Sequence, residues 1–168
     1  MPQSSFPQRK SPRLHGYNYS ASGAYFVTIC THQRQHLFGH ITDGAMLRTQ
    51  AGEIAAERWY ALPEHHSGIE LDAFIVMPNH VHGIMVLLGD AVGADNAGVV
   101  PTLGTVIGSY KSGVTRRIRE ALGVDNLIVW QGRYHDHIIL DEQGLNTIRE
   151  YVQNNVALWQ QDTFYSTP

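Results

Sequence analysis

Two extended segments separated by a two-residue break, Pro78-Asn79, constrain the fold of this chain most strongly. In the first segment, residues 69–77, apolar side chains recur at every second position. The second, residues 80–88, opens with two histidines, His80 and His82, and runs on into apolar residues. A period of two is typical of strands, and a proline interrupts the hydrogen bonding of a strand. The pattern therefore predicts two consecutive strands.

Residue type and spacing predict the other elements in the same way. β-branched and aromatic residues favour a strand, an Asp-Gly pair favours a tight turn, and apolar residues three or four positions apart indicate a helix. The expected order is a strand at 24–30, a hairpin within 36–49, a helix from Leu47 to Leu62 closed by Pro63, the strands 69–77 and 80–88, a helix over 103–122, an extended segment over 127–140 and a helix over 142–159.

This order of elements predicts the fold class. Helices that alternate with paired strands fit an α+β sandwich of the ferredoxin-like, split βαβ kind. Such a fold has a mostly antiparallel sheet with helices on one or both faces. At 168 residues we expect one domain over 23–160, preceded by a polar leader over 1–22 and followed by a tail over 161–168.

Composition limits the functional classes. With 43% hydrophobic and 16% charged residues the chain is typical of a globular protein. Cys30 is the only cysteine, so no internal disulfide can form and a reducing cytoplasm is expected, with association to the nucleoid if the partner is DNA. The longest apolar run, Ile84 to Leu88, is too short to span a membrane. A formal net charge of −3 counts mildly against nonspecific coating of nucleic acid.

His80 and His82 form a candidate metal site. They are separated by one residue, so a strand places both imidazoles on one face. Two neutral imidazoles aimed at one point can provide half of a divalent-metal site, which would need a third ligand as well as water or substrate oxygens. The alternative is a pair of hydrogen-bonded histidines at the end of a strand.

Tyr151 and Asn155 share one edge of the last predicted helix, because residues four apart lie one turn from each other. Asn155 could complete the metal site while Tyr151 reaches a bound phosphate. The alternatives are a tyrosine at the core boundary and an asparagine on the helix surface. A rival nucleophile, Tyr110, falls in the middle of an apolar stripe, and we therefore expect it in the core.

A basic cluster lies off the apolar stripe of the 103–122 helix. Side chains of this kind can contact the phosphates of a nucleic acid, although a solvated helix face has the same composition. The cluster consists of Lys111, Arg116, Arg117 and Arg119.

Several motifs together resemble one family. The chain is similar to the single-tyrosine HUH transposases, which include insertion-sequence-200-like enzymes, and in particular to the REP-associated tyrosine transposases. The resemblance covers roughly residues 13 to 160. It rests on Tyr25-Phe26-Val27-Thr28-Ile29-Cys30-Thr31, Met77-Pro78-Asn79-His80-Val81-His82-Gly83, Tyr110-Lys111-Ser112, Val129-Trp130-Gln131, Asp136-His137-Ile138-Ile139 and Tyr151-Val152-Gln153-Asn154-Asn155, in this order.

The resemblance implies a ferredoxin-like fold that acts on single-stranded DNA, often at hairpin-forming sequences. It implies that His80 and His82 bind a divalent metal, Mg²⁺ or Mn²⁺, and that Tyr151 is the nucleophile. Asn155 stands where relatives place a polar metal ligand, often glutamine. Two features depart from the family pattern: the chain is acidic overall, and Asn155 is followed by Val156 where proline is usual. Relatives occur both as monomers and as homodimers, and the tyrosine helix of some dimers serves the partner's site.

The expected reaction is attack of Tyr151 on a DNA phosphate, which gives a 5′-phosphotyrosine and a free 3′-hydroxyl. The same intermediate could then join a second DNA end. Two other functions are compatible with the residues. One is a catalytically inactive regulator that binds hairpin DNA, and the other is a metal-dependent phosphodiesterase in which Tyr151 is only structural.

Overall fold

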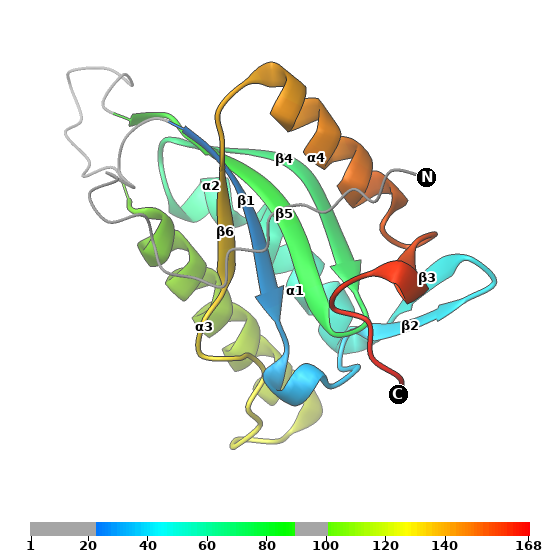
Figure 1. The fold of residues 1–168 in the computed structure, drawn as a ribbon. Helices are drawn as coiled ribbons and strands as arrows, with labels where there is room; N and C mark the ends of the chain where they lie inside the picture. Colours follow the sequence, from blue (N-terminus) through cyan, green and yellow to red (C-terminus); the bar gives the residue numbers. More distant parts are fainter. Residues whose placement is uncertain (1–22, 90–100) are drawn as a thin grey trace.

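The structure is a computed structural model that describes residues 23–89 and 101–168 (Figure 1). The predicted leader over 1–22 lies outside the described residues. The elements are, in chain order, β1 (Gly23–Cys30), the 3-10 turn η1 (His32–Arg34), β2 (Gly39–Thr42), β3 (Ala45–Arg48), α1 (Gln50–Tyr60), α2 (Leu62–His65), β4 (Ile69–Met77), β5 (His80–Leu87), α3 (Leu103–Leu122), β6 (His135–Ile139), α4 (Glu142–Asn154) and the 3-10 turn η3 (Trp159–Gln161).

Four strands form one antiparallel sheet in the order β4-β5-β1-β6. β1 pairs with β5 along its whole length, from Gly23 opposite Leu87 to Cys30 opposite His80. α1 lies between β1 and β4 in the chain, and α3 lies between β5 and β6. This is the split βαβ arrangement, with each long helix crossing between strands of the sheet. The predicted α+β, ferredoxin-like fold is confirmed.

The two faces of the sheet have different cores. α1 and α3 cover one face, where Trp59 stacks on Phe74 with ring centroids 4.7 Å apart. Gly83 lies directly beneath that indole, and a Cβ atom there would come within 2.2 Å of it. α4 covers the other face, over a smaller cluster that includes Ile84 and Ile148 (Figure 1). The helices therefore divide the molecule into a large apolar layer and a thin one.

β4 contains a bulge that the sequence did not indicate. The register shifts between Leu71 and Phe74, so Leu71 packs against the α1 and α3 core while Ala73 packs on the α4 side. The prediction of one continuous apolar face from 69 to 77 is therefore wrong. Within the bulge, Asp72 accepts a hydrogen bond from Arg149 Nε of α4 at 2.8 Å, and this bond lowers the pKa of the Asp72 carboxyl.

The first hairpin and helix correct one predicted boundary. The hairpin is confirmed as β2 and β3, joined through Asp43 and Gly44 at φ of 52° and 74°. Leu47 belongs to β3, and α1 starts only at Gln50, after Thr49 accepts a hydrogen bond from Gly52 N at 3.2 Å. Pro63 lies in the first turn of the short helix α2 instead of closing a longer helix. Proline fits there because the backbone N–H groups of a first turn have no acceptor within the helix.

The last predicted helix is too long, because α4 ends at Asn154 and not at residue 159. Short turns follow, in which Asn155 N donates to Val152 O and Trp159 N to Val156 O, each at 3.3 Å. These turns carry the end of the chain back over the α4 side of the sheet. Of the predicted extended segment 127–140, only 135–139 is a strand, together with an isolated bridge between Thr31 and Trp130.

None of the helices in the described part of the chain combines the length and the apolarity that crossing a membrane requires.

Candidate metal centre and nucleophile

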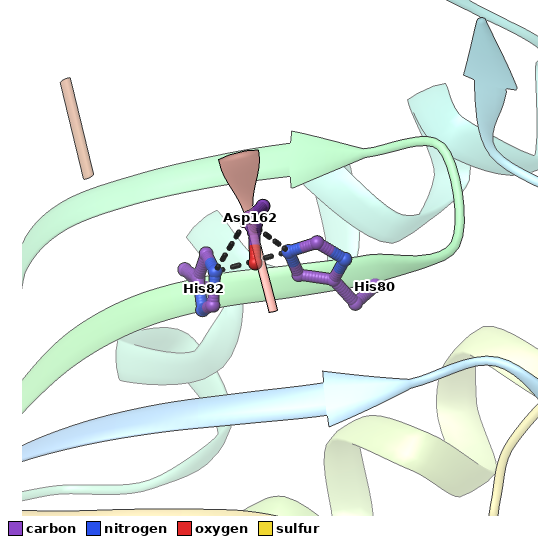
Figure 2. Close-up of side chains that lie close together, drawn as sticks. All are labelled: His80, His82 and Asp162. Carbon is purple, nitrogen blue, oxygen red and sulfur yellow. Dashed lines mark hydrogen bonds and ion pairs between the residues drawn. The ribbon is translucent and has the colours of Figure 1, made fainter. Parts of the chain in front are cut away.

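His80 and His82 begin β5 and their side chains lie on the same face of the sheet, as their spacing predicts (Figure 2). Both side chains are completely buried, and their Nε2 atoms lie 3.0 Å apart. The next residue on that face, Ile84, belongs to the thin core under α4. The sheet therefore holds two imidazoles at the mouth of an apolar layer, where backbone pairing on both sides limits their movement.

A polar group orients each imidazole from behind. Asn79 Oδ1 lies 2.7 Å from His80 Nδ1, and Thr28 Oγ1 of β1 lies 2.7 Å from His82 Nδ1. Partners of this kind turn the other ring nitrogen toward a metal. Burial lowers the pKa of His80 well below its usual value. Burial also lowers the pKa of His82, although the nearby Asp162 carboxylate acts to raise it. Both imidazoles are thus neutral near pH 7, the state in which they bind metal ions.

Asp162 is a third candidate ligand (Figure 2). Its side chain is 1% exposed, and its Oδ2 lies 3.7 Å from His80 Nε2 and 3.8 Å from His82 Nε2. Oδ1 accepts a hydrogen bond from Phe164 N at 2.8 Å, but Oδ2 has no hydrogen-bond partner among the described residues. A buried carboxylate oxygen whose nearest neighbours are two neutral imidazoles is costly unless a positive charge satisfies it. A divalent cation fits this set of two nitrogens and one oxygen, whose mixed chemistry suits Mn²⁺ somewhat better than Mg²⁺.

Tyr151 reaches the same point from α4. Its hydroxyl lies 3.4 Å from His82 Nε2, and its ring packs edge-on against Phe26. Burial and the nearby Asp162 carboxylate raise the pKa of Tyr151 to about 12, although a hydrogen bond from Asn155 acts in the opposite direction. The phenol of the metal-free site therefore keeps its proton at neutral pH.

Asn155 is 1% exposed, so the alternative of a solvated surface residue is wrong. Its side chain bonds with Tyr151, while its own Oδ1 has no hydrogen-bond partner among the described residues. The amide thus lies beside the candidate nucleophile. Its direct ligation of a metal stays a prediction.

The end of the chain covers the histidines. We call residues 159–166 the C-terminal strap. The ring of Phe164 lies against His80 and His82, with centroids 5.0 and 5.8 Å apart, and Trp159 approaches His80 at 5.9 Å. The sequence does not predict this contribution, since residues 161–168 show no periodicity and resemble a tail. An acidic residue shortly after the tyrosine helix was the available signal for Asp162.

Tyr110, the rival nucleophile, lies on the other face of the sheet. It is 1% exposed, its hydroxyl donates to Ala55 O at 2.9 Å, and burial raises its pKa. The expectation that it is a core residue is confirmed.

The basic cluster also lies on α3, on the face of the sheet opposite the histidines. Lys111 Nζ donates to Gln131 O at 2.6 Å, Arg119 Nε donates to Leu127 O at 3.0 Å, and Arg117 pairs with Glu120 at 3.3 Å. An open groove of ≈ 680 Å³ follows this side of α3. Lys111, Arg116, Arg119, Glu120 and Asp125 are among the residues that line it. The structure thus brings together His80, His82, Tyr151 and Asn155, and keeps the predicted DNA-binding residues apart from them.

Comparison with known proteins identifies a relative of this chain and solved structures with a similar fold. No family model matches it. A protein of Haemophilus influenzae strain Rd, described as an uncharacterized protein, is 36% identical over 167 residues, which cover 94% of this chain and 93% of that protein. Among solved structures, the REP-associated tyrosine transposase bound to a REP hairpin matches with a TM-score of 0.54 and 18% identity, over 84% of this chain and 71% of that one. A candidate transposase from Deinococcus radiodurans R1 has a TM-score of 0.46 and 20% identity, over 86% and 96% of the two chains. The chain therefore belongs to one family with the Haemophilus protein and has the fold of the REP-associated tyrosine transposase.

Proposed function

We propose that this protein is a transposase that nicks and joins single-stranded DNA through a 5′-phosphotyrosine at Tyr151, with a divalent metal held by His80, His82 and Asp162. One observation carries the proposal. The Tyr151 hydroxyl lies 3.4 Å from His82 Nε2, at the point where the buried histidine pair meets the Asp162 carboxylate oxygen that has no hydrogen-bond partner among the described residues. A nucleophile and a cation site close enough to engage one phosphate are what phosphoryl transfer requires.

The reaction balances without a further reactant. The Tyr151 oxygen bonds to phosphorus, the bond from phosphorus to the 3′ oxygen breaks, and the leaving 3′ oxygen ends with the proton that the phenol gives up. A cation held by the two histidines and Asp162 would supply stabilisation of the charge that develops on the phosphate. Tyrosine suits reversal of the step, because phenolate, with a pKa near ~10, is a better leaving group than an alkoxide. Asn155, bonded to the phenol, would help to orient it.

The phenol and His82 of a single chain are in contact, which supports attack within one chain in a monomer or a homodimer alike. Since the transposase that shares this fold is bound to a REP hairpin, hairpin-forming single-stranded DNA is the substrate we propose here. We further propose that a flanking part of the DNA contacts Lys111, Arg116, Arg117 and Arg119 on the far face.

The DNA contact can be tested by salt dependence. Replacing Arg116 and Arg119 by glutamine should lower the slope of log affinity against log salt concentration by ~0.7 for each single-strand phosphate that the variant no longer neutralises. Arg133→Gln, outside the cluster, is the matched control. An unchanged slope in the double variant would remove the cluster from the DNA-binding surface.

The proposed chemistry is tested by trapping the adduct. We would incubate the protein with single-stranded oligonucleotides that fold into hairpins with single-stranded flanks, in Mn²⁺ and in EDTA. The expected result is a species that survives denaturing electrophoresis, depends on Mn²⁺, and yields by mass spectrometry a peptide that carries DNA on Tyr151. Hairpin binding without an adduct would instead support the regulator, and turnover with water without an adduct would support the phosphodiesterase.

A further inference from the structure

Asn79 uses both ends of its side-chain amide. It lies in the turn between β4 and β5 and is 1% exposed. Its Nδ2 donates to Phe164 O at 2.9 Å and lies 3.1 Å from Ser166 Oγ, while its Oδ1 lies 2.7 Å from His80 Nδ1. Its backbone is also held, because Thr31 N donates to Asn79 O at 2.9 Å.

These partners determine the orientation of the Asn79 amide and the tautomer of His80. The carbonyl oxygen of Phe164 can only accept, so the nitrogen of the Asn79 amide must face it. The amide oxygen then faces His80, and because that oxygen can only accept, His80 Nδ1 must carry the proton. In a neutral imidazole the other nitrogen is then bare. Asn79 therefore turns the lone pair of His80 Nε2 toward His82 and Asp162.

The opposite end of the amide holds the C-terminal strap. Asp162 lies two residues before Phe164, and Phe164 N donates back to Asp162 Oδ1. The bond from Asn79 Nδ2 to Phe164 O thus fixes the backbone of Phe164. The N–H of the same residue in turn orients the Asp162 carboxylate. Without it, the strap would keep the bond between Ser166 and His36 Nε2, at 3.0 Å, as a hydrogen bond to the body of the protein.

We propose that Asn79 is a positioning residue for the metal centre, which presents His80 in its metal-binding tautomer and docks the strap so that Asp162 becomes the third ligand. This inference rests on the metal site of the proposed function. The order of the strap and the affinity for the metal should therefore both depend on the Asn79 side chain. Since the two ends of the amide have different tasks, two substitutions can separate them.

Asn79→Asp keeps an acceptor for His80 Nδ1 but loses the donor to Phe164 O. Asn79→Leu loses both. We would measure the tautomer of His80 by two-bond ¹H–¹⁵N correlations of the metal-free protein, the amide hydrogen exchange of residues 159–166, and the affinity for Mn²⁺. Wild type should show His80 protonated at Nδ1 and a strap that Mn²⁺ protects from exchange.

In Asn79→Asp the His80 tautomer should be unchanged, while strap amides exchange about fivefold faster or more, as expected when one hydrogen bond is removed. In Asn79→Leu the tautomer should become mixed, and Mn²⁺ binding should weaken about 10- to 100-fold, the range for outer-shell partners of metal ligands. His36→Ala is the matched control, because it removes a strap contact that does not touch His80. It should speed exchange of the strap and leave the tautomer unchanged.

Three results would each overturn the proposal: His80 protonated at Nε2 in the wild type, wild-type strap exchange in Asn79→Asp, or Mn²⁺ affinity within threefold of wild type in Asn79→Leu. Unchanged exchange of β1 and β5 amides in each variant shows that the sheet is intact. No readout involves DNA. A protein that passes these tests but forms no DNA adduct would refute the proposed function alone.

Discussion

Tyr110 and Tyr151 lie on opposite faces of one sheet, and the partners of their hydroxyl groups differ. Tyr110 is enclosed by the large core under α1 and α3, and its hydroxyl is bound to Ala55 O. Tyr151 is half-buried beside the thin core under α4, and its hydroxyl approaches His82. The same residue type therefore packs in the main core on one face and lies beside the candidate metal site on the other.

The comparison extends to the layers themselves. The α1 and α3 side contains most of the buried apolar side chains. The α4 side has a small apolar cluster and, at its open end, buried polar groups such as His80, His82 and Asn155. A sheet that buries its main core on one face can hold costly polar groups on the other, because the first layer supplies the stability that offsets them.

The largest expected effect separates the two tyrosines directly. Tyr151→Phe should abolish the covalent DNA adduct, a loss of at least ~10³-fold, as expected when a nucleophile is removed. Tyr110→Phe should keep the adduct and cost only ~1 kcal/mol of unfolding free energy, because it removes the hydrogen bond from the Tyr110 hydroxyl to Ala55 O. Denaturing gels and urea unfolding measure the two quantities. An adduct that survives in Tyr151→Phe would reject the assignment.

The next effect tests the large core. Gly83→Ala places a methyl group 2.2 Å from the indole of Trp59, and we expect it to lower the unfolding free energy by ~3 kcal/mol or more. Gly108→Ala is the control, since nothing lies within 4 Å of its added Cβ, and it should stabilise α3 by ~0.5–1 kcal/mol. If both variants unfold like wild type in denaturant, the packing of β5 against α1 is misjudged.

Metal should stabilise the α4 side in particular. At 100 times its Kd, Mn²⁺ should raise the unfolding free energy by ~2.7 kcal/mol. Asp162→Asn should reduce this gain below ~1 kcal/mol at the same concentration, because binding is weaker. Asp125→Asn, an exposed carboxylate in the groove beside α3, should keep the full gain. Thermal or urea unfolding with and without Mn²⁺ decides between these outcomes, and equal gains in both variants would exclude Asp162 as a ligand.

The smallest effect concerns acid. His80 and His82 have lowered pKa values in the folded state, so the unfolded chain binds protons that the folded chain resists. Stability should therefore fall as pH drops below about 6.5, by ~1–2 kcal/mol at pH 5.5 in the absence of metal. His82→Gln should flatten this acid limb, and the exposed His40→Gln should leave it unchanged. A wild-type protein equally stable at pH 7 and 5.5 would contradict the buried, neutral pair.

The sequence predicted the parts of the site that obey a regular period. His80 and His82 share a face because strands alternate, and Tyr151 with Asn155 shares an edge because helices turn every 3.6 residues. Asp162 obeys neither rule. It reaches the histidines through the irregular turns after Asn154, and a carboxylate delivered by irregular backbone leaves no periodic trace.

In the fold, too, the regular features were predictable and the irregular ones were not. The order and type of the elements were predictable, since each has its own apolar period and turn residues. The bulge between Leu71 and Phe74 was not predictable. An extra residue in a strand does not alter the alternation of apolar residues in the sequence, but it moves the side chains that follow to the opposite face of the sheet. The end of α4 was missed because Val156 and Trp159 continue the helical spacing, although Trp159 packs on His36 and His80 instead.

The bulge in β4 also has a mechanical role. Asp72 projects from it and holds Arg149, which lies two residues before Tyr151 on α4. The helix that carries the phenol is thus tethered to the sheet edge by a partly exposed ion pair, and dissolved salt screens such pairs. The histidines, by contrast, are fixed by backbone hydrogen bonds of the sheet, which salt does not weaken in this way. Raising the ionic strength should therefore loosen the tether between α4 and β4, while the strand pairing that holds His80 and His82 is unaffected.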